Sequence, residues 1–246
     1  MEDRAPRHYG GMILLALGLA LAGWFIGHGF ATVRAADRFV TVKGVAEREV
    51  RADLALWPIT MAATDDDLAR AQGRINQNVS KVMTFLLANG VDTTGATLQG
   101  LRVTDTMANA FRPPSSAGSR FIINQTVLVR STDPERIRSA SEKVGELVNA
   151  GVVLQSGPEW GPGGPTYLFK RLNNVKPGMI AEATAEARKA AEQFAKDSKS
   201  RIGGIRRASQ GVFTILPRDE APGIAQENQI YKTVRVVTTV EYILKD

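Results

Sequence analysis

After an apolar N-terminal stretch, apolar and polar residues follow two different periods along this chain of 246 residues. Over residues 39–45 the two kinds alternate and β-branched residues are common, which predicts a β-strand. A longer extended segment follows over residues 47–62, where Pro58 indicates an edge position or a bulge. Similar patterns predict further strands at residues 97–106, 121–131, 152–155, 166–171, 205–216 and 231–244.

Two later segments carry apolar residues at the spacing of an amphipathic helix. The first covers about residues 65–89, with Thr64 as its expected N-cap and Gly90 as its left-handed stop. The second begins at Thr132–Glu135, a capping box with proline in the first turn, and ends at Gly151. Both helices have one apolar face, so both are expected to pack on a sheet.

A third helix is predicted over about residues 178–201, and it is rich in alanine. Small side chains suit close packing on a sheet, with Ile180 and Phe194 as the larger anchors, and Gly203–Gly204 is expected to stop the helix. Residues 38–246 therefore form a predicted α+β body with antiparallel β-sheets and three amphipathic helices. The body is long enough for one large domain or two small ones.

Residues 11–33 form an apolar segment without a formal charge, apart from a partial one on His28, and they follow a short tail over residues 1–10. At ~1.5 Å per residue, a helix of this length reaches across a bilayer core of roughly 30 Å. We therefore expect one N-terminal transmembrane helix that anchors the body to a membrane. Within it, Gly23, Gly27 and Ala31 repeat at four-residue spacing, a face on which two membrane helices pack closely, although Gly and Ala are frequent in such helices anyway.

The alternative for this segment is a cleavable signal peptide. Arg4 and Arg7 then form the charged region, residues 12–26 the apolar region, and Val33–Ala35 the cleavage site. The apolar stretch is long for a signal peptide and Arg34 makes the cleavage site imperfect, so a retained anchor is favoured. The body leaves the cytoplasm under both interpretations.

Composition excludes most familiar catalytic sites. The chain has no Cys, and its two His, His8 and His28, precede the body, which excludes thiol chemistry, Ser-His-Asp triads and His-ligated metals there. Gly161–Pro165 lacks the Lys of a phosphate loop, and the acids Asp65–Asp67 suit a helix N-terminus. We therefore expect no enzyme activity, no catalytic residue, no cofactor and no metal.

The formal charge of +6 belongs to the body, because the charges of residues 1–33 cancel. The basic residues are scattered and few aromatic residues accompany them, so nucleic acid is not an expected partner. Five basic residues lie close together in the sequence. They either lie at the C-terminal end of a helix, where its dipole favours cations, or bind an anion. This basic cluster consists of Lys196, Lys199, Arg201, Arg206 and Arg207.

The long terminal strand carries β-forming residues on both faces. Such a strand is either central in its own sheet or covered by a neighbouring protomer. The residues that would then contribute to an oligomer contact are Val234, Val236, Val240 and Tyr242.

The order of these segments resembles the SIMPL-domain family, the YggE-like proteins of the bacterial envelope. Gly44 ends the first strand as in that family, and Asp53 stands in the acidic step into the second strand, with Ala52 where proline is usual. The segments that also match in order are Phe121–Asn124, Ala181–Ala195 and Val234–Leu244, so the resemblance covers about residues 38–246. It implies an α+β fold, export to the envelope, large ring-like homo-oligomers and a link to stress tolerance. The family offers no established active site to carry over.

Two functions follow as expectations. The first is a non-enzymatic envelope protein, anchored in the inner membrane with its body in the periplasm, or soluble there after cleavage, which works by self-assembly. The second is a binding or catalytic module for an anionic ligand, which uses the basic cluster or the long loops.

Overall fold

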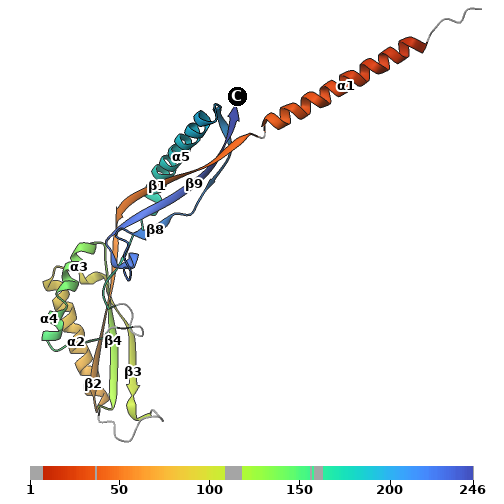
Figure 1. The fold of residues 1–246 in the computed structure, drawn as a ribbon. Helices are drawn as coiled ribbons and strands as arrows, with labels where there is room; N and C mark the ends of the chain where they lie inside the picture. Colours follow the sequence, from red (N-terminus) through yellow and green to blue (C-terminus); the bar gives the residue numbers. More distant parts are fainter. Residues whose placement is uncertain (1–7, 37, 109–117, 156, 158–162, 246) are drawn as a thin grey trace, which may run out of the picture. The chain divides into compact units, whose positions relative to one another are not determined.

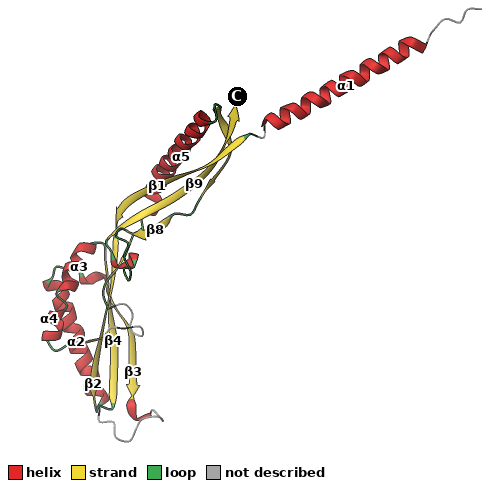
Figure 2. Cartoon of the chain, viewed as in Figure 1, coloured by secondary structure: helices red, strands yellow, loops and turns green. Residues whose placement is uncertain are grey.

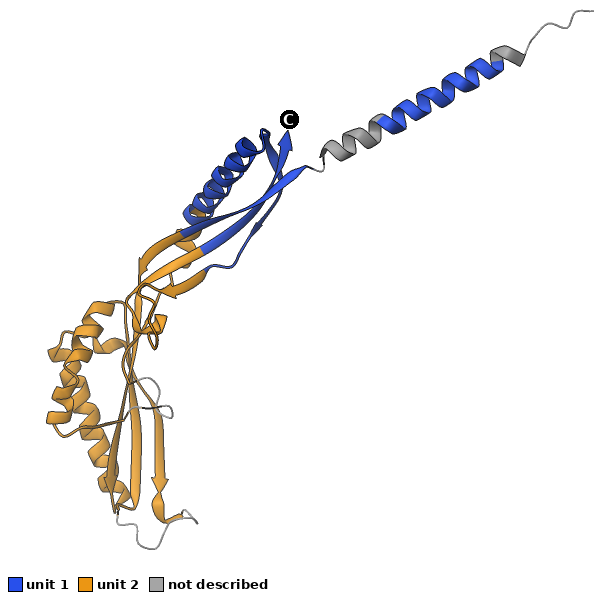
Figure 3. Cartoon of the chain, in the orientation of Figure 1, with its two compact units in different colours: residues 1–46, 178–213, 236–246 blue, residues 47–177, 214–235 orange. Residues whose placement is uncertain are grey.

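The computed structural model describes residues 8–36, 38–108, 118–155, 157 and 163–245, and Figure 1 shows their helices and strands. The first helix, α1, covers His8–Ala36. The chain forms two compact units, coloured separately in Figure 3. The first unit contains residues 1–46, 178–213 and 236–246, and the second contains residues 47–177 and 214–235.

The large apolar side chains of α1 are exposed by 52% to 74%. They are Met12, Ile13, Leu14, Leu15, Leu17, Leu19, Leu21, Trp24, Phe25 and Ile26. Side chains of this helix are described only for residues 11–27. Among the described residues, no helix combines the length and the apolar character that a membrane crossing requires. The transmembrane segment predicted over residues 11–33 is therefore not confirmed.

The first sheet has the strand order β1–β9–β7, with β8 also paired to β9 (Figure 2). Its strands are β1 Phe39–Arg51, β7 Arg201–Gln210, β8 Thr214–Pro217 and β9 Tyr231–Lys245. In the first unit, residues 178–197 of helix α5, Leu172–Asp197, cover one face of this sheet. Buried alanines of α5 pack there against Val42, Val240 and Tyr242.

The second sheet, in the second unit, has the order β3–β4–β2–β5, with β6 also paired to β2. Its strands are β2 Leu54–Asp65, β3 Ala96–Asp105, β4 Phe121–Ser131, β5 Val153–Gln155 and β6 Thr166–Leu168. Helices α2 Leu68–Ala88, α3 Pro134–Glu142 and α4 Gly145–Asn149 lie on one face of it (Figure 2). Three short 3₁₀ turns complete the described elements, at Thr93–Gly95, Thr106–Ala108 and Gln226–Asn228.

The core of the second unit lies between this sheet and its helices. Trp57 of β2 is 2% exposed and meets Phe85 of α2 edge to face, with 6.4 Å between the ring centroids. Ile75 and Leu86 of α2 are completely buried beside them. This packing accounts for the apolar periods of the sequence. The strand pairs β2–β4, β2–β5, β2–β6, β3–β4, β7–β9 and β8–β9 are all antiparallel. The predicted α+β class with antiparallel sheets is confirmed.

The described residues contain five α-helices, whereas the sequence predicted three helices in the body and one helix before the body. The predicted second helix is interrupted after Glu142, and α4 begins at Gly145. Two predicted caps are also wrong, the first by three residues and the second by one. Asp67, rather than Thr64, accepts from the backbone N–H of Arg70 at 2.9 Å, and Asp133 caps α3. Carboxylates accept hydrogen bonds at helix starts as readily as hydroxyl groups do.

The third predicted helix is displaced toward the N-terminus. It begins at Leu172, six residues before the prediction, and it contains Pro177. It ends at Asp197, where Lys199 adopts a φ of 53° and makes the turn. Gly203 therefore lies within strand β7, not at a helix end, and the single strand predicted over residues 205–216 is divided into β7 and β8.

The expected anchors of this helix are also wrong in part. Phe194 is 58% exposed, and Met179 is the large side chain that the helix buries completely. The expected close packing of alanines is present, because Ala183, Ala187 and Ala191 are all fully buried.

Candidate functional site

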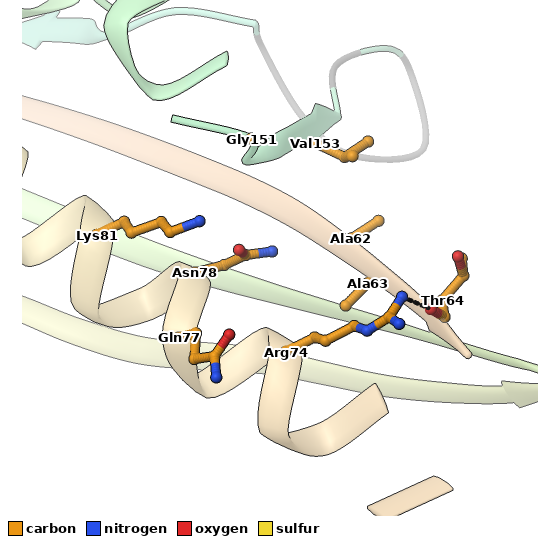
Figure 4. Close-up of a pocket in the computed structure, with 9 residues that line it drawn as sticks. All are labelled: Ala62, Ala63, Thr64, Arg74, Gln77, Asn78, Lys81, Gly151 and Val153. Atoms are coloured by element: carbon orange, nitrogen blue, oxygen red, sulfur yellow. Dashed lines mark hydrogen bonds between the residues drawn. The ribbon is translucent and has the colours of Figure 1, made fainter. Parts of the chain in front are cut away.

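The candidate site is a pocket of about 360 Å³ at one edge of the second sheet (Figure 4). Strand β5 pairs with β2 only as far as Ala62, so the edge of β2 beyond it has no strand neighbour among the described residues. Helix α2 runs beside this free edge. The lining residues are Ala62, Ala63, Thr64, Arg74, Gln77, Asn78, Lys81, Gly151 and Val153.

Four of these residues come from one face of α2. Arg74, Gln77, Asn78 and Lys81 stand at positions i, i+3, i+4 and i+7, which an α-helix places in one stripe. The neighbouring apolar stripe of α2 packs into the core and fixes the rotation of the helix. As Figure 4 shows, Arg74, Asn78 and Lys81 extend from α2 into the space beside strands β2 and β5.

Arg74 is neutralised where it stands. Its guanidinium lies 3.0 Å from a carboxylate oxygen of Asp65 and donates to the Thr64 carbonyl at 3.1 Å. Arg70 also donates to Asp65, and this bond, with a backbone hydrogen bond from Asp67 and the charge of Arg74, lowers the pKa of Asp65 below its usual value. Asp65 therefore forms ion pairs, Asp67 caps α2, and Asp66 accepts from the backbone N–H of Arg120 at 3.0 Å.

Lys81 and Asn78 differ from Arg74 in their partners. The Lys81 ammonium donates to the backbone carbonyl of Ala150 at 2.7 Å, a neutral acceptor at the end of α4. Asn78 is 8% exposed, and its side-chain amide has no hydrogen-bond partner within the described parts of the chain. Its amide atoms do not belong to the buried side-chain atoms without a partner, so they reach the space of the pocket.

Sequence reasoning missed this pocket. The polar stripe of α2 was visible as a spacing, but most helices carry a polar stripe that only faces water. Nothing local distinguishes Asn78 from a solvated residue, because its burial depends on strand β5 about 75 residues later. The acidic and His residues searched in the described ranges form no group of three that could hold a metal ion.

The basic cluster is divided between two places of the first unit. Lys196, Lys199 and Arg201 lie around the turn between α5 and β7. Arg206 and Arg207 follow along strand β7, and at ~3.3 Å per residue they lie roughly 15 Å further on than Arg201. The Arg206 guanidinium stacks over the ring of Phe39 at 4.3 Å. Anion binding by this cluster remains a prediction.

The four residues predicted for an oligomer contact are buried within the protomer itself. Val234, Val236, Val240 and Tyr242 are between 0% and 3% exposed, and β9 lies between other strands of the first sheet. They are not accessible to a second protomer in this fold. Gly23, Gly27 and Ala31 lie on α1, and a Cβ added at either glycine would meet no other atom within 4 Å. Their role in helix packing remains a prediction.

Among the described residues, Lys232 is the largest that is completely buried. Its ammonium donates to the backbone and side-chain oxygens of Gln226, so it fixes the turn that precedes β9. Burial lowers the pKa of Lys232 below its usual value, and the charge of Glu227 opposes this effect in part. The folded chain therefore holds this proton less tightly than the unfolded chain does.

This difference makes stability depend on pH. Between the lowered pKa and the ordinary value near 10.5, the unfolded chain binds more protons, so the free energy of unfolding rises with pH. We expect chemical denaturation to show that wild type gains stability relative to Lys232→Met as the pH is raised from 7 to 10. The exposed Lys43→Met variant is the control and should follow the wild-type profile. A constant difference between wild type and Lys232→Met at all pH values would contradict the expectation.

The two residues that carry the resemblance have structural roles. Gly44 lies against α5, where an added Cβ would be 1.8 Å from the carbonyl oxygen of Ala183. The Asp53 carboxylate accepts from the backbone N–H groups of Lys170 and Arg171, at 2.9 and 3.0 Å. Both residues therefore position helix α5.

A comparison with curated proteins found no match to this chain. A family model, SIMPL (protein of unknown function, DUF541), matches residues 40–242. The match covers most of the chain and includes Gly44 and Asp53, and the chain therefore belongs to the SIMPL family.

Proposed function

We propose that this SIMPL-family chain is a non-enzymatic protein of the bacterial envelope that α1 attaches to the inner membrane and that works by self-assembly. The observation that carries the proposal is the exposed apolar surface of α1, where ten large apolar side chains are each more than half exposed. Contiguous apolar surface of this size requires a cover, and a lipid bilayer is the cover that a helix without formal charges over residues 11–27 favours.

Open sheet edges support the assembly part of the proposal. Strands β3 and β7 are edge strands among the described strands, and almost all of their residues are exposed. On β3, Leu98, Leu101 and Val103 are between 47% and 55% exposed. Edges with free backbone groups and apolar side chains pair readily with another chain. Attachment to one membrane would raise the effective concentration of such edges.

In this proposal the body lies in the periplasm, its partners are the membrane and further copies of the chain, and its assembly is linked to envelope or oxidative stress tolerance. The alternative, a soluble location after cleavage behind Ala35, predicts a different mature N-terminus. Catalysis is not part of the proposal, because the body offers neither His nor Cys.

The test compares three proteins extracted in mild detergent by native mass measurement. They are the full chain, the chain shortened to begin at residue 37, and the full chain with Gly23→Leu and Gly27→Leu. We expect the full chain to fractionate with membranes, to retain its N-terminus and to give a multiple of 26.6 kDa.

A smaller assembly in the Gly23→Leu, Gly27→Leu variant would assign the small-residue face of α1 to helix packing. An assembly of unchanged size would place the contacts in the body. Monomers in all three proteins at high concentration would overturn self-assembly. A soluble mature protein that begins near Ala36 would overturn the membrane attachment.

A further inference from the structure

The side-chain amide of Asn78 lines the α2 pocket and has no hydrogen-bond partner in the described chain. The residue as a whole is 8% exposed. Figure 4 shows this amide directed into the space between α2 and strand β5. Asparagine supplies two N–H donors and one acceptor, so a molecule in the pocket would meet both kinds of group.

A cation stands one helical turn away on the same face. The Lys81 ammonium carries three donors, and the Ala150 carbonyl takes one of them at 2.7 Å. The positive charge of Arg74 is already matched by Asp65 at 3.0 Å. The positive charge of Lys81 therefore has a neutral carbonyl as its partner, unlike that of Arg74. Lys81 and Asn78 line the same pocket.

The remaining lining is small and largely apolar. Ala62 and Ala63 form one wall from β2, and Val153 of β5 faces them. Gly151 leaves room beside the ammonium, because a Cβ added there would lie 3.9 Å from the Lys81 nitrogen. A volume of about 360 Å³ accommodates a small molecule with a short apolar part.

We infer that this pocket binds a small molecule that carries an oxyanion, either a carboxylate or a phosphate. One acid oxygen accepts from the Lys81 ammonium and another accepts from the Asn78 amide, while the apolar part lies against Ala62 and Ala63. Charge-assisted hydrogen bonds of this kind are stronger than neutral ones. They would use the N–H groups of Lys81 and Asn78 that have no acceptor within the described chain. This binding function lies beyond membrane attachment and self-assembly and does not depend on either.

The test is ligand-observed NMR on the full chain in detergent at constant ionic strength, with sodium butyrate in one titration and inorganic phosphate in another. We expect saturable binding with a dissociation constant on the order of 1 mM, as suits so small a ligand. Saturation by butyrate alone would assign a carboxylate ligand, by phosphate alone a phosphate ligand, and by both a general oxyanion site.

Three variants locate the binding. Lys81→Met should weaken it about tenfold or more, since it removes a charge-assisted hydrogen bond. Lys81→Gln keeps a donor for the Ala150 carbonyl and should bind as weakly, which separates lost charge from lost structure. Asn78→Asp, nearly identical in shape, should abolish binding through repulsion of the anion.

The matched control is Lys143→Met, which removes the same charge from an exposed lysine of the same unit. Its affinity should equal that of wild type. The inference is overturned if neither butyrate nor phosphate saturates the wild-type chain, or if Lys143→Met weakens binding as much as Lys81→Met does. Undiminished binding in both Lys81 variants would overturn it as well.

Discussion

Replacing Gly44 with alanine is expected to destabilise the first unit by about 3 kcal/mol. An alanine Cβ at this position would lie 1.8 Å from the Ala183 carbonyl oxygen and 2.5 Å from the Ala187 nitrogen. Both atoms belong to the backbone of α5, so no side-chain rotation relieves the clash. The helix must move away from β1, and the fully buried contacts of Ala183 and Ala187 are lost.

Chemical denaturation measures the loss, and hydrogen exchange locates it. Amides of α5 and β1 should exchange faster in Gly44→Ala, whereas those of β2 and β4 should be unaffected. Gly73→Ala is the matched control, because Gly73 lies inside α2 with no atom within 4 Å of the added Cβ. That variant should gain up to ~1 kcal/mol from helix propensity. Equal stability of the two variants would disprove close packing at Gly44.

Replacing Asp53 with alanine should cost about 2–3 kcal/mol. The Asp53 carboxylate is 10% exposed and accepts from two backbone N–H groups, at 2.9 and 3.0 Å, immediately before α5 begins. The guanidinium of Arg171 also forms an ion pair with this carboxylate, at 3.4 Å. Without the carboxylate these donors lose their partner, and the first turn of α5 loses its fixed starting point.

Asp53→Asn separates charge from geometry. One amide oxygen remains to accept a hydrogen bond, so this variant should recover part of the stability that Asp53→Ala loses. Exchange of the amides over residues 172–177 reports the fraying of α5 directly. The exposed Glu220→Gln control should stay within about 0.5 kcal/mol of wild type. If Asp53→Ala matched that control, Asp53 would not position the helix.

Local patterns predicted the elements whose apolar faces are continuous in sequence. Strand β4 has the predicted bounds Phe121–Ser131, because an alternation of eleven residues depends on neither partner nor turn. Helix α2 was placed within three residues for the same reason. The family resemblance was also available from sequence, since it depends on the order of such segments.

Local patterns could not predict boundaries that distant residues impose. Helix α5 begins at Leu172 because the Asp53 carboxylate, 117 residues before Lys170, holds the preceding backbone. Asp67, rather than Thr64, caps α2 because the strand β2 continues to Asp65 and pairs there with Phe121. Both residue types are favoured at N-caps, and the sheet register places Thr64 inside strand β2.

The sequence by itself determined the α+β class, the order of the long strands and helices, the family and the absence of Cys from the chain and of His from the body. Only the tertiary structure decided that the valines of β9 lie inside the protomer, that Gly44 admits the α5 backbone, and that Asn78 is buried beside Lys81. The physical reason is that periodicity records which face of an element is apolar, whereas burial of a single polar group depends on which distant strand covers it.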